Sequence, residues 1–139
     1  MGFFDLFCKK LFPKKKEIDL PIETLKFNKM FDLWADGKIE SPYQDLMTYQ
    51  TEVNNGGHSQ FFFNLENSRS LEVVVRENMS ILPDVHKINL EKAYSAYKEY
   101  ADIDEDKLDD ILDECDNVFY QYEEEINEIL EKYSLRIVL

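Results

Sequence analysis

The sequence contains few of the residues that build disulfide scaffolds, metal centres and tight loops. Its 139 residues include two cysteines, two histidines, four glycines and four prolines. The two cysteines, Cys8 and Cys115, stand far apart and exclude a disulfide-rich scaffold or a zinc site, so the composition is typical of a reducing compartment. No apolar run approaches the ~20 residues that a helix needs to span a bilayer, and no signal-peptide cleavage pattern follows the N-terminus. We therefore expect a cytoplasmic protein.

Residue patterns that carry catalysis are also missing. His58 and His86 do not stand in the His-Glu-x-x-His spacing, and neither a Gly-x-Ser-x-Gly motif nor a phosphate-binding loop is present. The stretch that begins at Asp102 resembles the start of a calcium loop, but Lys107 stands where that loop needs Gly and Asp113 where it needs a bidentate Glu. We predict that the protein is not an enzyme and that it binds no metal and no cofactor.

Positive charge is scarce over most of the chain. Sixteen Lys and Arg face 29 Asp and Glu, which gives a formal net charge of −13. Such a surplus disfavours nucleic acid and anionic bilayers as ligands of the main body and favours basic partners. We therefore predict a basic protein as the partner and no direct binding to nucleic acid.

Apolar residues recur at helical spacing, and the start and stop signals of helices separate them. Asp36-Gly37 is a stop signal, and Ser41-Pro42 is a start signal with a capping hydroxyl and a proline in the first turn. We predict helices from about Ile22 to Trp34, Pro42 to Asn54, Phe61 to Phe63, Leu71 to Met79 and Pro83 to Tyr100.

The last helix is predicted to be the longest. Apolar residues recur three and four positions apart from Leu108 to Tyr133, which indicates one continuous amphipathic helix. The chain shows no hairpin signal and no internal repeat, and its length suits one domain. The predicted fold class is all-α, with a single compact helical domain of five to six helices at residues 21–139 and a short N-terminal tail at residues 1–20.

Two adjacent glycines stand in a segment rich in amides and aromatic residues, Glu52-Val-Asn-Asn-Gly-Gly-His-Ser-Gln-Phe-Phe-Phe-Asn64. Asn and Gly at the end of a polar helical run are typical of a left-handed C-terminal residue. We predict a sharp turn here, which we call the glycine corner, and a new helix that buries two of the phenylalanines while its amides bond to open backbone groups. The residues assigned to the corner are Asn55, Gly56, Gly57, Gln60, Phe61, Phe62 and Asn64.

This segment resembles the motif of a bacterial family of DNA-mimic proteins, Asn-Gly-Gly-aromatic-x-Gln-aromatic-aromatic-x-Asn. The specific likeness covers residues 54–64, with His58 where the family has an aromatic residue, and a looser pattern extends from Phe27 to Tyr133. The resemblance implies a helical domain whose acidic surface imitates duplex DNA and occupies a DNA-binding protein. Many members of that family have no assigned role.

Acidic residues concentrate near the end of the chain. Fifteen stand between Glu99 and Glu131, with Lys107 as the one basic residue among them. Because the apolar stripe faces inward, we predict an outward row of carboxylates about 5–6 Å apart, comparable with the phosphates of a nucleic-acid strand. The alternative is a solvated helix face that keeps an aromatic-rich protein in solution. The predicted partner-binding residues are Asp102, Glu105, Asp106, Asp109, Asp113, Asp116, Glu124, Glu128 and Glu131.

The first sixteen residues differ from the rest because they are basic and rich in Phe. That composition is typical of a short amphipathic anchor at a membrane surface, which would place the protein at the inner face of the membrane. The alternatives are that the tail packs its Phe side chains on the domain or has no fixed structure. The tail residues concerned are Phe3, Phe4, Phe7, Lys9, Lys10, Lys14, Lys15 and Lys16.

Three hypotheses for the function follow from these features. The first is a non-catalytic acidic protein that competes with DNA for a basic DNA-binding protein. The second is an immunity or antitoxin-like protein that neutralises a basic toxin by the same electrostatic attraction. The third is a membrane-surface adaptor that the N-terminal tail anchors.

Overall fold

Helices are the regular secondary structure of the part of the chain that the structure describes. The computed structural model describes residues 19–66 and 70–139, and within these ranges it contains six helices and no strand. The prediction of an all-α fold with five to six helices is confirmed. The helices are α2 (Ile22–Ala35), α3 (Tyr43–Glu66), α4 (Leu71–Met79), α5 (Asp84–Tyr100), α6 (Glu105–Gln121) and α7 (Glu123–Ser134).

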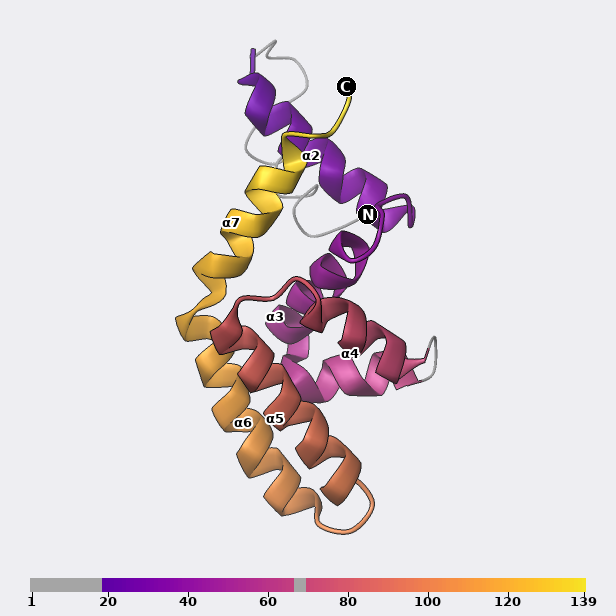
Figure 1. The fold of residues 1–139 in the computed structure, drawn as a ribbon, viewed down its shortest axis with the longest axis vertical. Coiled ribbons are helices and arrows are strands. Elements are labelled where there is room, and N and C mark those ends of the chain that lie inside the picture. Colours follow the sequence, from indigo (N-terminus) through magenta and orange to yellow (C-terminus); the bar gives the residue numbers. More distant parts are fainter. Residues whose placement is uncertain (1–18, 67–69) are drawn as a thin grey trace.

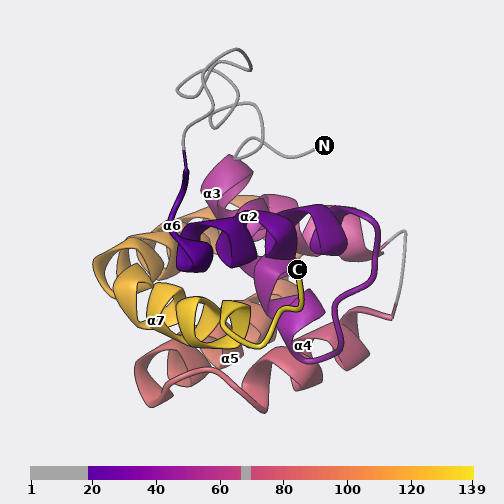
Figure 2. The ribbon, with the colours of Figure 1, turned by 90° about the horizontal axis from the view of Figure 1, so that it is seen from above.

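The helices form an elongated arrangement with two different ends (Figure 1). Helices α5 and α6 run antiparallel and form one end, and α2 forms the other end together with the last residues of the chain. Between them α3 packs against α4, α6 and α7, while α2 packs on α7. The view along the long axis shows α2 lying across the molecule beside α7 (Figure 2). We call the α5–α6 pair the acidic hairpin.

The ends of the helices follow the sequence signals. Pro21 and Pro83 precede α2 and α5 with extended backbone angles, φ −54° and ψ 147° for the first and φ −60° and ψ 157° for the second. Gly37 has φ +70° just after α2, which is the left-handed conformation expected of a stop glycine. Helix α6 has an N-cap, which we did not predict. The Asp104 carboxylate accepts a 3.1 Å hydrogen bond from the Lys107 backbone N–H.

The prediction of one long last helix is wrong, because α6 ends at Gln121 and α7 begins at Glu123. Between them Tyr122 has φ −116° and ψ 15°, away from helical values. Its carbonyl oxygen accepts a 2.7 Å hydrogen bond from Nε2 of the buried His86. The apolar spacing continues across the break, so the sequence pattern does not show it. His86, which stabilises the break through this hydrogen bond, lies on α5, 36 residues before Tyr122 in the sequence.

An aromatic cluster joins the two halves of α3 to α6. Tyr49, Phe61, Phe62 and Phe119 are fully buried, and the ring centroid of Tyr49 lies 4.9 Å from that of Phe61 and 5.4 Å from that of Phe119. Edge-to-face contacts of this kind add to the hydrophobic contribution of the rings. The predicted burial of Phe61 and Phe62 is confirmed, and the cluster holds the glycine corner against α6.

The N-terminal tail predicted at residues 1–20 falls mostly outside the described part of the chain. Its candidate membrane residues, from Phe3 to Lys16, all lie there. The boundary between residues 20 and 21 stays a prediction. Among the described residues, no helix combines the length and the apolarity that crossing a bilayer requires.

Candidate functional site

The glycine corner is a real change of direction inside α3. Gly56 has φ −162° and ψ 23°, and Gly57 has φ 75° and ψ −177°, a combination that is essentially restricted to glycine. A Cβ atom at residue 57 would also clash with the Asp116 carboxylate. The predicted turn is confirmed, and the close approach of α6 gives a second reason for a glycine at this place.

An aspartate from α6 caps the helix segment that follows the corner. Oδ1 of Asp116 accepts hydrogen bonds from the backbone N–H of His58 at 2.8 Å and from the ring Nδ1 of His58 at 2.7 Å. The first N–H groups of a helix need such acceptors, which usually come from the residue just before the helix. Here the acceptor stands 58 residues later in the chain. The corner and α6 are therefore one structural unit.

The other side of the His58 ring contacts a buried tyrosine. The Tyr49 hydroxyl lies 2.7 Å from Nε2 of His58. Burial raises the pKa of the Tyr49 hydroxyl well above its usual value, and the nearby Cys115 and Asp116 add to this effect. A buried hydroxyl needs an acceptor, so Tyr49 donates to Nε2, and Nδ1 then carries the proton that it donates to Asp116. Tyr49, His58 and Asp116 thus form a chain of hydrogen bonds with fixed proton positions.

The motif amides bridge the two halves of α3. Gln60 Nε2 and Asn64 Nδ2 both donate to Oε2 of Glu52, at 3.1 and 2.6 Å. Gln60 therefore bonds to a side chain, where the sequence predicted a backbone group. Asn55 is exposed beside the two glycines. Through these contacts the amide side chains of the segment hold the geometry of the corner.

The carboxylates of the acidic hairpin form a short row on α6. Asp106, Asp109, Asp110 and Asp113 are exposed, and none of them makes an ion pair or a hydrogen bond within residues 19–66 and 70–139. Their spacing of three, four and seven residues places them along one face of the helix. The row begins next to Glu105, which is also exposed. These side chains retain their full capacity to accept hydrogen bonds from a partner.

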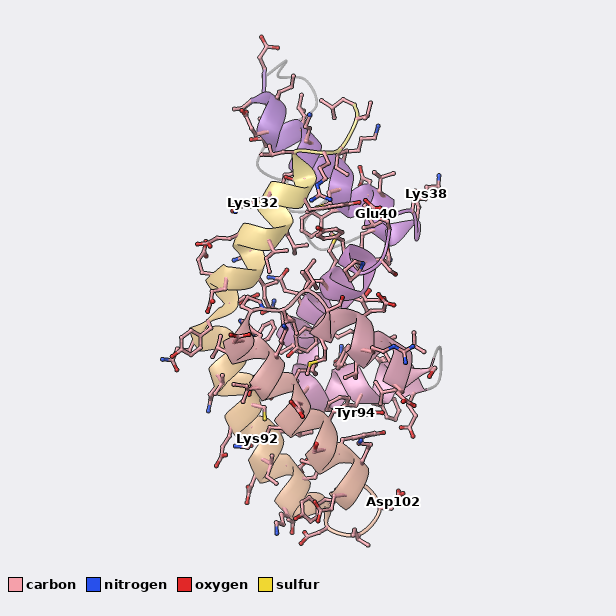
Figure 3. The ribbon with its side chains drawn as sticks, viewed as in Figure 1. Lys38, Glu40, Lys92, Tyr94, Asp102 and Lys132 are labelled. Carbon is pink, nitrogen blue, oxygen red and sulfur yellow. The ribbon has the colours of Figure 1, made fainter. Side chains whose placement is uncertain are left out.

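The lysines near this row interact with other groups. Lys92 pairs with Glu114 at 3.0 Å, and the ammonium groups of Lys98 and Lys107 lie 4.4 and 4.7 Å from the centres of tyrosine rings of α5. Figure 3 shows Lys92 midway along the hairpin and Asp102 at its tip. Within residues 19–66 and 70–139, none of these three lysines therefore forms an ion pair with the row. Among the described residues, no group of three or more His, Cys, Asp or Glu side chains is placed to hold a metal ion.

The predicted row does not continue along the whole end of the chain. Asp116, with 21% of its side chain exposed, points to the glycine corner, and the break at Tyr122 interrupts the helix. Glu124, Glu128 and Glu131 are exposed on α7, beyond that break. From Asp106 to Asp113 the helix rises only about 10.5 Å, or about three base-pair steps of duplex DNA. The acidic surface is thus shorter than the sequence pattern predicted, and it is divided between two helices.

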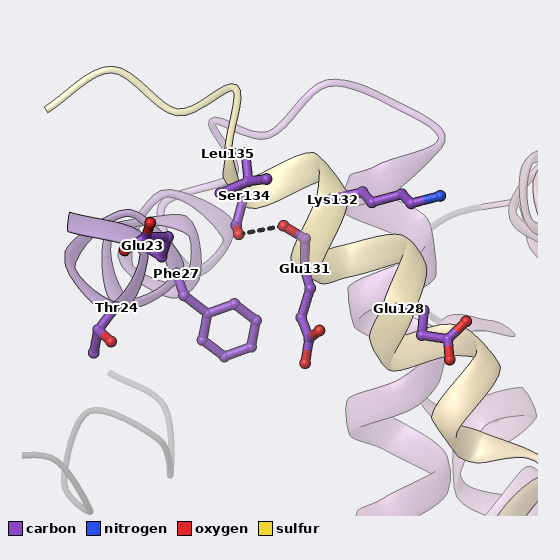
Figure 4. A pocket seen from close by; sticks show the side chains of 8 residues that line it. All are labelled: Glu23, Thr24, Phe27, Glu128, Glu131, Lys132, Ser134 and Leu135. Atoms are coloured by element: carbon purple, nitrogen blue, oxygen red, sulfur yellow. Dashed lines mark hydrogen bonds between the residues drawn. The ribbon is translucent and has the colours of Figure 1, made fainter. Parts of the chain in front are cut away.

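A groove lies between α2 and α7, beside their contact, at the other end of the molecule (Figure 4). It has a volume of about 550 Å³, and we call it the α2–α7 groove. Phe27 projects from α2 toward α7, and the Glu131 side chain lies beside its ring. The residues that line the groove are Glu23, Thr24, Phe27, Glu128, Glu131, Lys132, Ser134 and Leu135.

Sequence reasoning did not identify two side chains that hold the corner in place. One is Tyr49, and the other is Glu123, whose carboxylate accepts hydrogen bonds from Gln50 at 3.0 Å and Asn54 at 2.6 Å. Glu123 stands in a run of three glutamates that looks uniform in the sequence. No local signal distinguishes it, because its partners lie 73 and 69 residues away.

Comparison with known proteins identifies one family. A family model described as DMP19-like protein matches residues 43–137, which is more than half of the chain and includes every described helix except α2. The match covers the glycine corner, the acidic hairpin and α7. No curated protein and no solved structure matches the chain.

Proposed function

This chain belongs to the DMP19-like protein family, and from that premise we propose that it is a non-catalytic interaction protein that occupies the DNA-binding surface of a basic protein. The family is one of DNA mimics. The observation that carries the proposal is the row Asp106, Asp109, Asp110 and Asp113, which makes no ion pair and no hydrogen bond among the described residues.

The electrostatics of the row favour a basic partner. Neighbouring carboxylates on a helix face lie about 5–6 Å apart and repel one another by a few tenths of a kcal/mol per pair. A partner's Lys and Arg side chains relieve this repulsion when they bind, and long-range attraction accelerates the encounter. A surface that normally binds phosphates presents such side chains.

The shortness of the row indicates that binding uses more of the hairpin than one line of carboxylates. A specific interface buries about 800 Å² on each partner, more than a 10.5 Å row provides. The tip of the hairpin adds Asp102, Glu105 and the side chain of Ile103, which is 77% exposed. We infer that the carboxylates attract and orient the partner while the tip supplies apolar contact.

The environment of the two histidines supports a non-catalytic role. Both ring nitrogens of His58 have partners inside the fold, and the ring is fully buried. His86 is also fully buried, and its Nε2 bonds to the Tyr122 carbonyl. Neither imidazole is presented to a substrate, which is the first requirement for a general acid or base.

A capture experiment with charge-reversed variants tests the proposal. The wild-type protein, the hairpin variant Asp106→Lys/Asp109→Lys/Asp113→Lys and a control are immobilised at low salt and exposed to a lysate of the source cell. The control Asp32→Lys/Asp36→Lys/Glu72→Lys carries the same change of charge at exposed residues outside the hairpin. We expect a basic DNA-binding protein on the wild type and the control but not on the hairpin variant, and duplex DNA should release it.

Three results would contradict the proposal: equal capture by the hairpin variant, no basic protein among the retained ones, or failure of DNA to compete. A basic toxin without affinity for DNA would instead support the antitoxin hypothesis, in which the same surface is used. Circular dichroism of all three proteins checks that the variants remain helical.

A further inference from the structure

The aspartate row continues along α6 as an uncharged stretch of the same face. Asn117, Tyr120 and Gln121 follow Asp113 at three- and four-residue steps, and all of them are exposed. From Asp106 to Tyr120 the helix rises about 21 Å, about twice the length of the row alone. We call this surface the α6 face, and none of its residues is Lys or Arg. The α6 face consists of Asp106, Asp109, Asp110, Asp113, Asn117, Tyr120 and Gln121.

Tyr120 is the aromatic residue of this face, and the fold holds it in place. The residue is 47% exposed, and its hydroxyl donates a 2.8 Å hydrogen bond to the carbonyl of Val53. Val53 belongs to the last turn of α3 before the glycine corner, where carbonyls lack partners within the helix. The Phe119 ring packs edge-to-face on the Tyr120 ring, with the centroids 5.5 Å apart. A side chain that is already fixed loses little entropy on binding, which favours Tyr120 as an anchor for a partner.

Two carboxylates lie near the Tyr120 side chain. Asp116 stands one turn earlier on α6, and Glu123 begins α7. Burial raises the pKa of the Tyr120 hydroxyl, and the negative charges of Asp116 and Glu123 add to this rise. The face of an aromatic ring attracts cations, and nearby carboxylates strengthen this attraction. The surroundings of Tyr120 therefore suit a positively charged group.

Other tyrosines of this chain already make such contacts. Three cationic side chains lie over tyrosine rings, at 4.4 to 5.6 Å from the ring centres. Over the part of the chain that the structure describes, no cation lies over Tyr120, which is also more exposed than those tyrosines. Its ring is thus left to a cation of another molecule. The pairs within the chain are Lys98 with Tyr94, Lys107 with Tyr100, and Arg136 with both Tyr43 and Tyr133.

We propose that Tyr120 is the anchor for an arginine side chain of the basic partner, whose guanidinium plane stacks on the tyrosine ring. This inference rests on the proposed function, because it takes the partner to be a basic protein bound at the acidic hairpin. Arginine fits better than lysine, because a guanidinium is planar, stacks on aromatic faces and is more weakly hydrated than an ammonium. The aspartates attract any basic surface. Tyr120, about 10.5 Å beyond Asp113 along α6, selects a surface with an arginine at that distance.

Two synthetic peptides of equal charge test the proposal on the full chain. Octa-arginine and octa-lysine feel the same long-range attraction, so a difference between their responses to a substitution reports a contact specific to guanidinium. At low salt, Tyr120→Leu should weaken the binding of octa-arginine by roughly 2- to 5-fold, as expected for one exposed cation–π contact. It should leave the binding of octa-lysine nearly unchanged. Isothermal titration calorimetry measures both affinities, and circular dichroism checks that the variant remains helical.

Two control variants separate the ring from its surroundings. Tyr122→Leu should change neither affinity, because Tyr122 is also exposed, at 38%, but lies beyond the end of α6. Tyr120→Phe loses the hydrogen bond to Val53 but keeps the ring, so it should keep most of the affinity for octa-arginine. Equal weakening of octa-arginine by Tyr120→Phe and Tyr120→Leu would overturn the proposal, and so would equal weakening of the two peptides by Tyr120→Leu.

The charge-reversed hairpin variant distinguishes a failure of this inference from a failure of the proposed function. Asp106→Lys/Asp109→Lys/Asp113→Lys should weaken both peptides more than Tyr120→Leu does. If it binds both peptides as the wild type does, the acidic hairpin is not the binding surface, and the proposed function and the anchor are both wrong. If it weakens both while Tyr120→Leu weakens neither, the proposed function stands and the anchor alone is overturned.

A measurement on the wild type keeps the test decisive if Tyr120→Leu does not fold. In the complex with octa-arginine, we expect nuclear Overhauser effects between the arginine Hδ protons and the ring protons of Tyr120. Such effects at other tyrosines but not at Tyr120 would contradict the proposal.

Discussion

Two aspartates of α6, one turn apart, serve opposite purposes. Asp116 faces the glycine corner and accepts two hydrogen bonds from the buried His58, whereas Asp113 is exposed and bonds to nothing in the part of the chain that the structure describes. The sequence presents both as members of the same acidic row. The difference between them depends only on whether a buried donor faces the carboxylate.

The contrast applies to the two regions as a whole. In the glycine corner, the carboxylates of Glu52, Asp116 and Glu123 accept hydrogen bonds from side chains or backbone of α3. In the acidic hairpin, the row from Asp106 to Asp113 has no such donors among residues 19–66 and 70–139. Hydrogen bonds to a charged group contribute about 1.5–3 kcal/mol, whereas an exposed charge contributes little to stability. The first set therefore holds the fold, and the second is available for a partner.

The largest effect is expected for Gly57→Ala. The substitution places a side chain in a glycine-only conformation and pushes its Cβ into the Asp116 carboxylate, so we expect a loss of about 3 kcal/mol or more in the free energy of unfolding. Urea denaturation followed by circular dichroism measures it. Gly37→Ala is the control, because Gly37 also has positive φ but open space around it, and about 1 kcal/mol is expected there. Equal losses at both positions would show that the corner imposes no steric requirement beyond its backbone angle.

Asp116→Asn and Asp113→Asn compare the two regions directly. The first weakens both bonds to His58 and should cost about 2 kcal/mol in the free energy of unfolding. The second should change it by less than about 0.5 kcal/mol, because the residue is exposed and has no partner in the described part of the chain. The same urea experiment serves both variants. If the two losses are similar, the distinction between structural and available carboxylates does not hold.

Tyr49→Phe tests the far end of the hydrogen-bond chain. Removal of the hydroxyl leaves Nε2 of the buried His58 without its donor, and we expect a loss of about 1–2 kcal/mol. Tyr122→Phe provides the control, because that hydroxyl is more exposed and its bond to Gln121 is long, at 3.4 Å. If Tyr49→Phe and Tyr122→Phe lose the same free energy of unfolding, the hydrogen bonds to Asp116 alone hold the His58 ring in place.

The smallest effect is expected in the hairpin itself. Asp110→Asn/Asp113→Asn relieves repulsion along the row and should raise the free energy of unfolding by a few tenths of a kcal/mol at low salt. Since salt screens exposed charges, the difference from the wild type should vanish near 0.5 M NaCl, where the screening length falls below about 5 Å. Unfolding curves at two salt concentrations measure this. A decrease in stability, or a difference that salt does not change, would show that these carboxylates have an internal structural role after all.

Much of the fold was predictable because its signals are local. Prolines and glycines mark the ends of α2, α3 and α5, and the apolar period of three and four residues marks the faces that become buried. The turn at Gly56 and Gly57 was predictable for the same reason, since a positive φ is a property of a single residue. The negative charge of the hairpin also follows from composition, because charge is additive along the chain.

Only the tertiary structure decided which carboxylates are available and where the last helix breaks. His86 reaches the Tyr122 carbonyl from α5, and His58 reaches Asp116 from α3, across 36 and 58 residues. The helical spacing of apolar residues in the sequence continues unchanged through such contacts. It therefore indicates neither the break at Tyr122 nor the inward orientation of the Asp116 side chain. By itself the sequence determined an acidic helical domain with a sharp corner. The packing of distant segments determined which acidic residues build that corner and which remain on the surface, because hydrogen bonds depend on proximity in space.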